Sequence, residues 1–206
     1  MKHRGTEVTE GILFFTPRFQ LFLQVHLSFL PTSSASALPL RFKVLPIPAS
    51  YNNPVIHVRQ YQPEDFPRLL EIDQSCFVEG IAYSKEEMRY FVDMPTAISL
   101  VGTQGKIIMG FIIADRFRPR RALRSMGKII TIDVAPEAQH SGLGTLLMSA
   151  AEAELKLAGC DYVSLEVAVD NEPALKFYKK HGYAVLKVLP RYYLDSIDGL
   201  LMGKKL

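Results

Sequence analysis

A glycine-containing loop is the segment of this sequence with the clearest potential for chemistry. It reads Gln139-His140-Ser141-Gly142-Leu143-Gly144-Thr145 and lies between an apolar predicted strand and a predicted helix. Glycine lets the backbone approach a ligand closely, and a helix N-terminus offers unpaired N–H groups and a positive dipole end. The loop lacks the glycine spacing of dinucleotide sites and the Gly-Lys-Ser/Thr of nucleoside-triphosphate sites. It therefore indicates either a pyrophosphate site of another kind or a plain tight turn into the helix.

Two further residues downstream of the loop have side chains suited to a site. Glu166 lies on a predicted strand, where its carboxylate projects opposite to Leu165 and Val167. That carboxylate is expected to face a cleft or to form a salt bridge at its rim. Asn171 directly precedes a predicted helix, and asparagine is one of the preferred N-cap residues.

Two motifs, in this order along the chain, resemble the signatures of the GNAT N-acetyltransferase family. Gln139-x-x-Gly142-x-Gly144, after a strand that ends in Ile132-Asp133-Val134, is similar to the family's acetyl-CoA motif. Further along, the segment from Asn171 to Tyr183 is similar to Asn-x-x-Ala-x-x-x-Tyr-x-x-x-Gly-Phe, with Tyr183 at the usual Phe position. The resemblance covers Ile56 to Leu206 and implies acetyl-CoA as co-substrate, with no metal.

The resemblance also implies which residues hold the co-substrate. In this family the pantetheine arm lies between the strands before and after the loop's helix, so backbone groups of Ile132, Asp133 and Val134 are expected to bind it like an added strand. The N–H of Val134 then polarises the thioester carbonyl, and the Asn171 side chain contacts the arm. The loop is expected to hold the pyrophosphate through Gln139, His140, Ser141, Gly142, Leu143, Gly144 and Thr145.

A third segment, Arg191 to Met202, resembles the N-terminal α-amine acetyltransferases, including the RimI-like ribosomal-protein-alanine acetyltransferases. This implies a protein or peptide N-terminus as acceptor, held in part by Tyr192 and Tyr193, unless these tyrosines only cover the sheet edge. An α-amino group of pKa ~7.7 to 8.0 is neutral in roughly a tenth of molecules at pH 7, whereas lysine at ~10.4 is almost wholly charged. A modest base is therefore enough to deprotonate an α-amino acceptor.

Acetyl transfer to an amine needs a held thioester, a polarised carbonyl, a neutral amine and a proton for the departing thiolate. By resemblance, Glu166 corresponds to the general base proposed for the RimI-like group. Tyr178 corresponds to the tyrosine that protonates the thiolate, although packing on a helix also explains it. Asp133 stands where the family more often has a small residue, so both acids remain open as the base.

The periodicity of apolar residues places these motifs in a chain that mixes strands and helices. It predicts a strand at 56–59, helices opening at Pro63 and Ser84, strands at 97–103, 106–115 and 128–134, a helix at 142–157, a strand at 162–167, a helix at 172–181, and strands at 184–189 and 200–204. This order indicates an α+β, or mixed α/β, fold. The resemblance implies the GNAT fold, whose mostly antiparallel sheet is splayed between strands 128–134 and 162–167 and has helices on both faces.

The composition is that of a globular protein, with 206 residues, 48% hydrophobic and 22% charged. A net charge of +3 is less than phosphate-backbone binding usually requires, so no nucleic acid partner is expected. The basic run from Arg116 to Lys128 is interpreted as a solvated loop, with an acidic partner or RNA as the alternative. Cys76 and Cys160 fit neither a disulfide framework nor a metal site and are predicted to be reduced core residues of a cytoplasmic protein.

The first 55 residues differ in composition from the rest. They contain no acidic residue after Glu10, and five prolines lie between Pro31 and Pro54. Their apolar stretch, Phe19 to Leu30, is shorter than the ~18 to 20 apolar residues of a membrane span, so no membrane segment is expected. We expect residues 1–55 to be a disordered or leader-like extension, with a secretory or organellar signal as the alternative, and residues 56–206 to be the acetyltransferase domain.

Three functions remain open from the sequence. The first is transfer to the N-terminal α-amine of a protein, such as a ribosomal protein. The second is transfer to a small-molecule amine or a lysine side chain, and the third is a non-catalytic CoA-binding regulator with the same fold. Glu166, Tyr178 and the intact glycine loop argue against a regulator, and the Tyr192-Tyr193 pair favours a peptide acceptor.

Overall fold

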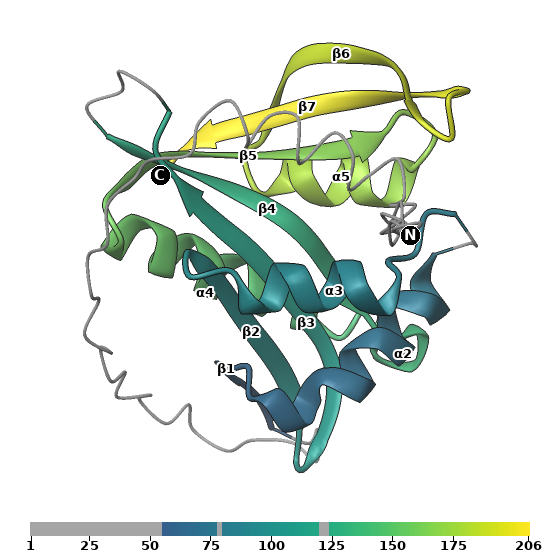
Figure 1. The fold of residues 1–206 in the computed structure, drawn as a ribbon, viewed down its shortest axis with the longest axis vertical. Coiled ribbons are helices and arrows are strands. Elements are labelled where there is room, and N and C mark those ends of the chain that lie inside the picture. The colour runs from purple at the N-terminus through teal and green to yellow at the C-terminus, as the bar shows by residue number, and fades with distance from the viewer. Residues whose placement is uncertain (1–54, 78–79, 120–123) are drawn as a thin grey trace, which may run out of the picture.

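One seven-stranded sheet organises the chain in the computed structural model, which describes residues 55–77, 80–119 and 124–206 (Figure 1). The strand order is β1-β2-β3-β4-β5-β7-β6. Every neighbouring pair is antiparallel except β4 and β5, which are parallel, so the predicted mostly antiparallel sheet is confirmed. The strands are β1 (Ile56–Gln60), β2 (Ala97–Gln104), β3 (Ile107–Phe117), β4 (Ser125–Val134), β5 (Cys160–Ala168), β6 (Ala184–Tyr193) and β7 (Ile197–Lys205).

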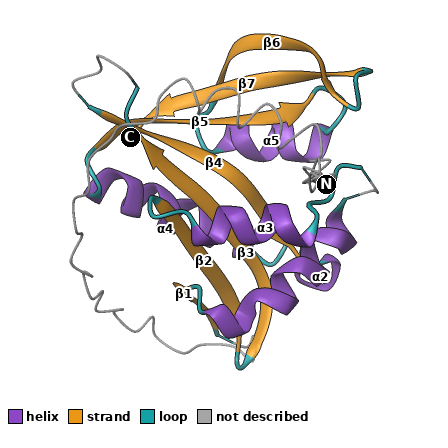
Figure 2. Cartoon of the chain, viewed as in Figure 1, coloured by secondary structure: helices purple, strands orange, loops and turns teal. Residues whose placement is uncertain are grey.

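Helices cover both faces of the sheet, as Figure 2 shows. Two of them, α2 (Phe66–Cys76) and α3 (Lys85–Asp93), pack on one face over a core that includes Phe91 and Phe111. On the other face α4 (Leu143–Leu157) packs over Ile112 and Leu165, and α5 (Glu172–Lys180) contributes partly buried residues to the same core. Short 3-10 turns at Pro63–Asp65 and Pro136–Ala138 precede α2 and α4. The order of strands and helices is the predicted one.

Helix starts follow the capping residues that the sequence indicated. Ser84 accepts a hydrogen bond from the backbone N–H of Glu87, and the Glu87 carboxylate accepts one from the Ser84 N–H, so the two residues form a capping box at α3. At α5 the Asn171 Oδ1 atom accepts from the Ala174 N–H at 3.2 Å. These contacts confirm both predicted helix starts.

The sheet divides where β4 and β5 separate. Among the described residues their ladder consists of Ser125↔Cys160, Gly127↔Val163 and Lys128↔Ser164. Beyond Lys128, β4 continues to pair with β3 as far as Val134, and β5 continues to pair with β7 as far as Ala168. Figure 1 shows the two parts of the sheet diverging from this junction. The opening lies where the splay was predicted.

An extra residue in β4 decides which side chains face which layer. The register of β3 and β4 shifts between Ile113↔Thr131 and Ala114↔Ile129, which leaves Ile130 as a β-bulge. Ile129 packs in the core under α4, whereas Ile130 packs in the core under α2 and α3. Beyond the bulge, Ile132 and Val134 pack against the α4 side, so Thr131 and Asp133 face the α2 side.

The predicted N-terminal extension lies outside the described residues, apart from Val55. Within the described ranges, no helix has the length and apolar character needed to cross a membrane.

Candidate active site

A cleft of about 640 Å³ opens between β4, α4 and α5. Most residues expected to hold acetyl-CoA line it, although they come from three elements and the connecting loops. Those residues are Ile132, Asp133, Val134, Gln139, His140, Gly142, Gly144, Thr145 and Asn171, joined by the predicted acid Tyr178. The structure thus brings the two motifs of the sequence to one cavity.

Two predicted loop residues have other positions. Leu143 is 1% exposed and belongs to the core under α4. Ser141 donates from Oγ to the carbonyl of Ala138 at 2.6 Å and accepts from the N–H of Leu143 at 3.3 Å. Neither side chain lines the cleft. Both residues shape the loop from within, which the sequence pattern alone did not reveal.

The glycine loop enters α4 through a left-handed residue. Gly142 is the N-cap with φ of 87°, and a Cβ placed on it meets nothing within 4 Å. His140 also has a positive φ, of 61°. First-turn N–H groups such as those of Gly144 and Thr145 have no carbonyl partner within a helix, so they are available to an anion.

Tyr178 lies on the inner side of α5, at the edge of the cleft. Its half-buried ring packs edge-on against Phe177, with ring centroids 5.5 Å apart, and tilted against Tyr183 at 5.9 Å. These contacts fix the ring while the residue still lines the cavity. The ring therefore packs on its neighbours and also lies at the cleft, where its proposed role would require it.

A carboxyl and a thiol meet at the end of β4. Asp133 is 2% exposed, and its two oxygens accept from Oγ1 of Thr131 at 3.0 and 3.1 Å. The Cys76 thiol donates to the carbonyl of Val134 at 3.4 Å. Burial, with the neighbouring charge of Asp133 as the next cause, raises the pKa of Cys76 to about 11. This thiol is therefore protonated at neutral pH. A core position was predicted for it, but Cys76 is only half-buried and lines the cleft, whereas Cys160 is buried as predicted.

Glu166 lies apart from the residues that line the large cleft. Its carboxylate forms an ion pair with the Lys128 ammonium at 2.9 Å, and the two side chains are only 16% and 7% exposed. The assignment of Lys128 to a solvated basic loop is wrong, because the residue is buried on β4. In the rest of that run, Arg116 belongs to β3, Arg118 and Arg124 are exposed loop residues as predicted, and Arg120 and Arg121 lie outside the described part of the chain.

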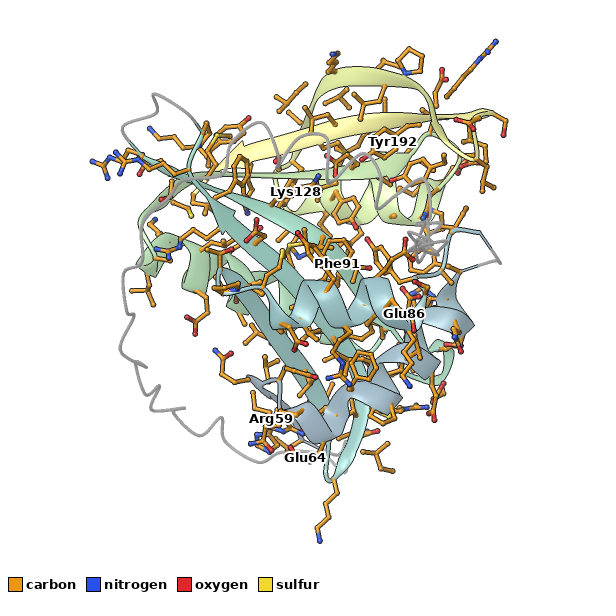
Figure 3. All side chains as sticks on the ribbon, viewed as in Figure 1. Arg59, Glu64, Glu86, Phe91, Lys128 and Tyr192 are labelled. Carbon is orange, nitrogen blue, oxygen red and sulfur yellow. The ribbon has the colours of Figure 1, made fainter. Side chains whose placement is uncertain are left out.

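The ion pair lines a small cavity of about 10 Å³ together with Tyr83, Phe91, Ile130, Tyr192 and Tyr193. In Figure 3 Lys128 lies between Phe91 of α3 and Tyr192 of β6. This cavity is on the sheet face that carries α2 and α3, because Tyr83, Phe91 and Ile130 all belong to that core. Glu166 and the tyrosine pair, predicted separately as base and acceptor site, thus meet at one place.

The tyrosine pair forms part of the wall of this cavity. Tyr192 and Tyr193 are each 6% exposed, and their rings pack edge-on at 4.9 Å. Three non-glycine residues around them have left-handed backbones, namely Arg191, Leu194 and Asp195, with φ near 52°. Such conformations are uncommon outside glycine and are held by surrounding contacts. One such contact is the hydrogen bond from the Arg191 N–H to Asp198 at 2.8 Å.

Residues 66–183, more than half of the chain, match the acetyltransferase (GNAT) family. An uncharacterized N-acetyltransferase, MJ1530, of Methanocaldococcus jannaschii is 31% identical over 150 residues, which cover 72% of this chain and 90% of the relative. N-alpha-acetyltransferase 30 of Schizosaccharomyces pombe is 33% identical over 116 residues, covering 56% and 77%. The chain belongs to the GNAT acetyltransferase family.

Solved structures show the same fold. The ribosomal-protein-S18-alanine N-acetyltransferase of Escherichia coli aligns with a TM-score of 0.63 at 21% identity, covering 73% of this chain and 94% of that one. The NatC complex bound to Gag peptide and CoA contains a chain that aligns with a TM-score of 0.65 at 24% identity, covering 73% and 98%. As a member of this family, the protein is an acyltransferase.

The cleft has features that fit the acetyl-CoA used by GNAT enzymes. The side of Gly142 that would carry a Cβ is open, which leaves room for a phosphate against the N-terminus of α4. Lys180 adds an exposed cation to the same lining. Among the described residues no group of three metal-ligating side chains is present.

Several cleft residues were not singled out from the sequence. Phe177 follows Ala174 by nearly one helical turn and Lys180 by nearly two. Both therefore lie on the face of α5 that Ala174 and Tyr178 define, and helical spacing would have predicted them. Cys76 and Phe77, at the end of α2, reach the cleft only through the packing of that helix on the sheet. No local pattern indicates such a contact.

Proposed function

We propose that this GNAT enzyme transfers the acetyl group of acetyl-CoA to the N-terminal α-amino group of a protein or peptide. One observation carries the proposal: where β4 and β5 diverge, the glycine-loop cleft is lined from α4 and α5 and also by Asp133 and Cys76 from the α2 side, the face that carries the aromatic cavity with the Glu166 carboxylate. A thioester in the cleft and an amine at the aromatic cavity would meet between the strands. The names of several relatives, which are N-alpha-acetyltransferases, support the same acceptor.

The chain supplies a group for each step of the transfer. The Val134 N–H is proposed to polarise the thioester carbonyl, and Glu166 to accept the proton that the attacking amine loses. Tyr178, on the cleft side, is proposed to protonate the departing thiolate. Asn171, already engaged as the cap of α5, and Gln139, whose Nε2 lies 3.4 Å from the carbonyl of Val134, would contact the pantetheine arm.

Asp133 is the alternative base, because it lines the cleft directly and Glu166 does not. Both carboxyls face the α2 side of the sheet, one from each diverging strand. Glu166→Gln should lower kcat by ~10² to 10⁴ and recover in part at high pH, as more of the acceptor amine becomes neutral. If Asp133→Asn abolishes turnover and Glu166→Gln stays within about twofold of wild type, Asp133 is the base.

The acceptor is tested by incubating the full chain with acetyl-CoA and a peptide library that varies the first two residues, half of it with blocked N-termini and an internal lysine. Mass spectrometry locates the acetyl group, and thiol release gives the rate. Modification of free N-termini alone is the expected result. Acetylation of the blocked, lysine-containing half would identify a lysine acetyltransferase, and CoA binding without any acetylation would identify a regulator.

The proposal includes a cytoplasmic location. Cys76 and Cys160 are both free thiols, as proteins of a reducing compartment usually have.

A further inference from the structure

Lys128 is an unusual residue for its position. Its side chain is 7% exposed in the middle of the sheet, next to the buried Ile129 and Ile130. Lysine is almost never buried to this degree without a partner, because moving an ammonium group out of water is costly. The carboxylate of Glu166, 2.9 Å away, offsets that cost. A pair of apolar residues would fill the same space without it, so stability alone gives no reason for the two charges.

The place of the pair in the sheet gives a reason. Lys128 is the last residue of β4 that pairs with β5, and Glu166 lies two residues beyond its partner Ser164. The ion pair therefore bridges the two strands at the point where they begin to separate. A carboxylate on the diverging part of β5 is held there by a cation on the part of β4 that remains paired.

The surroundings of the pair face the proposed acceptor. Two packed ring pairs line the small cavity: Tyr192 with Tyr193, and Tyr83 with Phe91, whose ring centroids are 5.1 Å apart. The aromatic rings leave the Glu166 carboxylate little space to move, and the ion pair with the Lys128 ammonium sets its orientation. The cavity of about 10 Å³ leaves room for little more than one small group beside the carboxylate.

We propose that Lys128 is a positioning residue for acetyl transfer, which holds the Glu166 carboxylate at the junction of β4 and β5 in the orientation that receives the proton of the acceptor amine. This rests on the proposed function. In the step, the amine nitrogen forms a bond to the acetyl carbon and the carbon–sulfur bond breaks. One amine proton goes to Glu166 and the thiolate takes a proton from Tyr178; the proton on Glu166 then returns to Tyr178 through water, so the products are amide and free thiol.

The test is a set of variants of the full chain: Lys128→Met, Lys128→Arg, Glu166→Gln and the double variant K128M/E166Q. Turnover is measured at saturating peptide and acetyl-CoA, with KM for acetyl-CoA as the second readout. Lys128→Met should lower kcat ~10- to 10²-fold, the cost of a misplaced catalytic group, with the KM for acetyl-CoA within about twofold. Lys128→Arg, which keeps the cation, should recover part of the loss.

The double variant decides the question. If Lys128 acts through Glu166, K128M/E166Q should have the kcat of Glu166→Gln alone, within about twofold, because no carboxylate remains to be positioned. A further drop of tenfold or more would show an independent role for Lys128 and overturn the inference. So would a Glu166→Gln variant with normal turnover. If Lys128→Met does not fold, the comparison of Glu166→Gln with the double variant, which retains neither charge, still gives the answer.

A matched control is available in Lys204→Met. Lys204 forms an ion pair with Glu152 at 2.7 Å, with side chains 20% and 14% exposed, and it does not line either cavity. It should lose stability without losing kcat. The wild-type enzyme distinguishes failure of the proposed acceptor from failure of the Lys128 proposal. If it acetylates lysine or a small amine instead of peptide N-termini, the proposed acceptor is wrong. The same variants then test Lys128 with that amine as acceptor.

Discussion

Gly142 has a backbone that only glycine adopts without strain, with φ of 87° and open space where a Cβ would be. Gly142→Ala should therefore weaken acetyl-CoA binding by about tenfold or more, since the loop must either relax or present its N–H groups from a strained residue. Calorimetric titration with acetyl-CoA measures this. Gly159→Ala is the matched control, because Gly159 has φ of 83° and open space at the opposite end of α4. Equal losses in the two variants would contradict a phosphate site at Gly142.

Cys76 gives a prediction for pH. Burial and the neighbouring Asp133 raise its pKa from 9.0 to about 11, so at pH 8 its thiolate fraction is about a hundredfold below that of an ordinary cysteine. Alkylation by iodoacetamide, followed by mass spectrometry, should be slow at pH 8, accelerate up to about pH 11, and be suppressed by acetyl-CoA. Below pH 9 the thiol is protonated in both the folded and the unfolded chain; between pH 9 and 11 it ionises mainly in the unfolded chain, so the free energy of unfolding falls over that range. Rapid labelling at pH 8 with bound acetyl-CoA would place the thiol outside the cleft.

The sequence could predict single residues where the evidence is local. Asn171 caps α5 and Gly142 opens α4, because each effect depends on neighbours within a few positions. The ion-pair partner of Glu166 could not be predicted, because that contact is not local. Lys128 and Glu166 lie on different strands, and nothing near either residue indicates that the parallel register brings them together.

At the scale of elements, one polar cluster joins α4, β7 and the turn after α5. Glu152 on α4 accepts from the Tyr183 hydroxyl at 3.0 Å and from the Lys204 ammonium at 2.7 Å, and Lys204 also donates to the carbonyl of His181. Burial, followed by the charge of Glu152, raises the pKa of Tyr183 above its usual range. This cluster accounts for the tyrosine at position 183, where the family usually has phenylalanine: its hydroxyl has a partly buried acceptor.

Tyr183→Phe should accordingly lower the free energy of unfolding by about 1.5 to 3 kcal/mol, the loss of a hydrogen bond to a charged group. Glu152→Leu should cost more, about 3 to 5 kcal/mol, since it leaves Lys204 largely buried without its anion. Urea unfolding measures both, and turnover in the folded state should be unchanged. A Tyr183→Phe variant as stable as wild type would show that the hydroxyl contributes nothing.

The order and type of all the main elements followed from periodicity and capping, but the bulge at Ile130 did not. Lys128 to Val134 is apolar at most positions, so alternation along this strand gives no indication of which side each residue faces. The bulge is a property of the β3–β4 pairing, which depends on residues in both strands. The sequence alone therefore could not place Asp133 and Glu166 on the same face of the sheet.

For the whole molecule, the described residues form one sheet with cores on both faces, and both cavities lie within them. We therefore predict that a protein starting near Asn53 folds and turns over acetyl-CoA with kcat/KM within about twofold of the full chain. Thermal unfolding and steady-state kinetics on the two proteins check this. A shorter protein that aggregates or loses activity would show that residues 1–52 pack on the domain.

The residues of the glycine loop and of the α5 motif could be predicted to lie at one cleft, because each motif is a continuous segment. The proposed acceptor side was only partly predictable. Tyr192 and Tyr193 were expected to hold the acceptor, and Glu166, expected either at a cleft or in a salt bridge, lies beside them in an ion pair. Helices α2 and α3 and the loop between them contribute Cys76, Phe91 and Tyr83 through packing alone. Discontinuous sites of this kind depend on distances between elements, which no single stretch of sequence specifies.

The parting of β4 from β5 also bears on the solution behaviour of the protein. Two strands that separate inside a sheet present main-chain edges at its centre, and exposed edges are where chains associate by adding strands to one another. A ligand that lies between them covers those edges and binds only the folded form, which adds about 2.7 kcal/mol at a hundred times its dissociation constant. The purified enzyme should therefore be most prone to self-association when prepared without its co-substrate, and storage with CoA should keep it monodisperse.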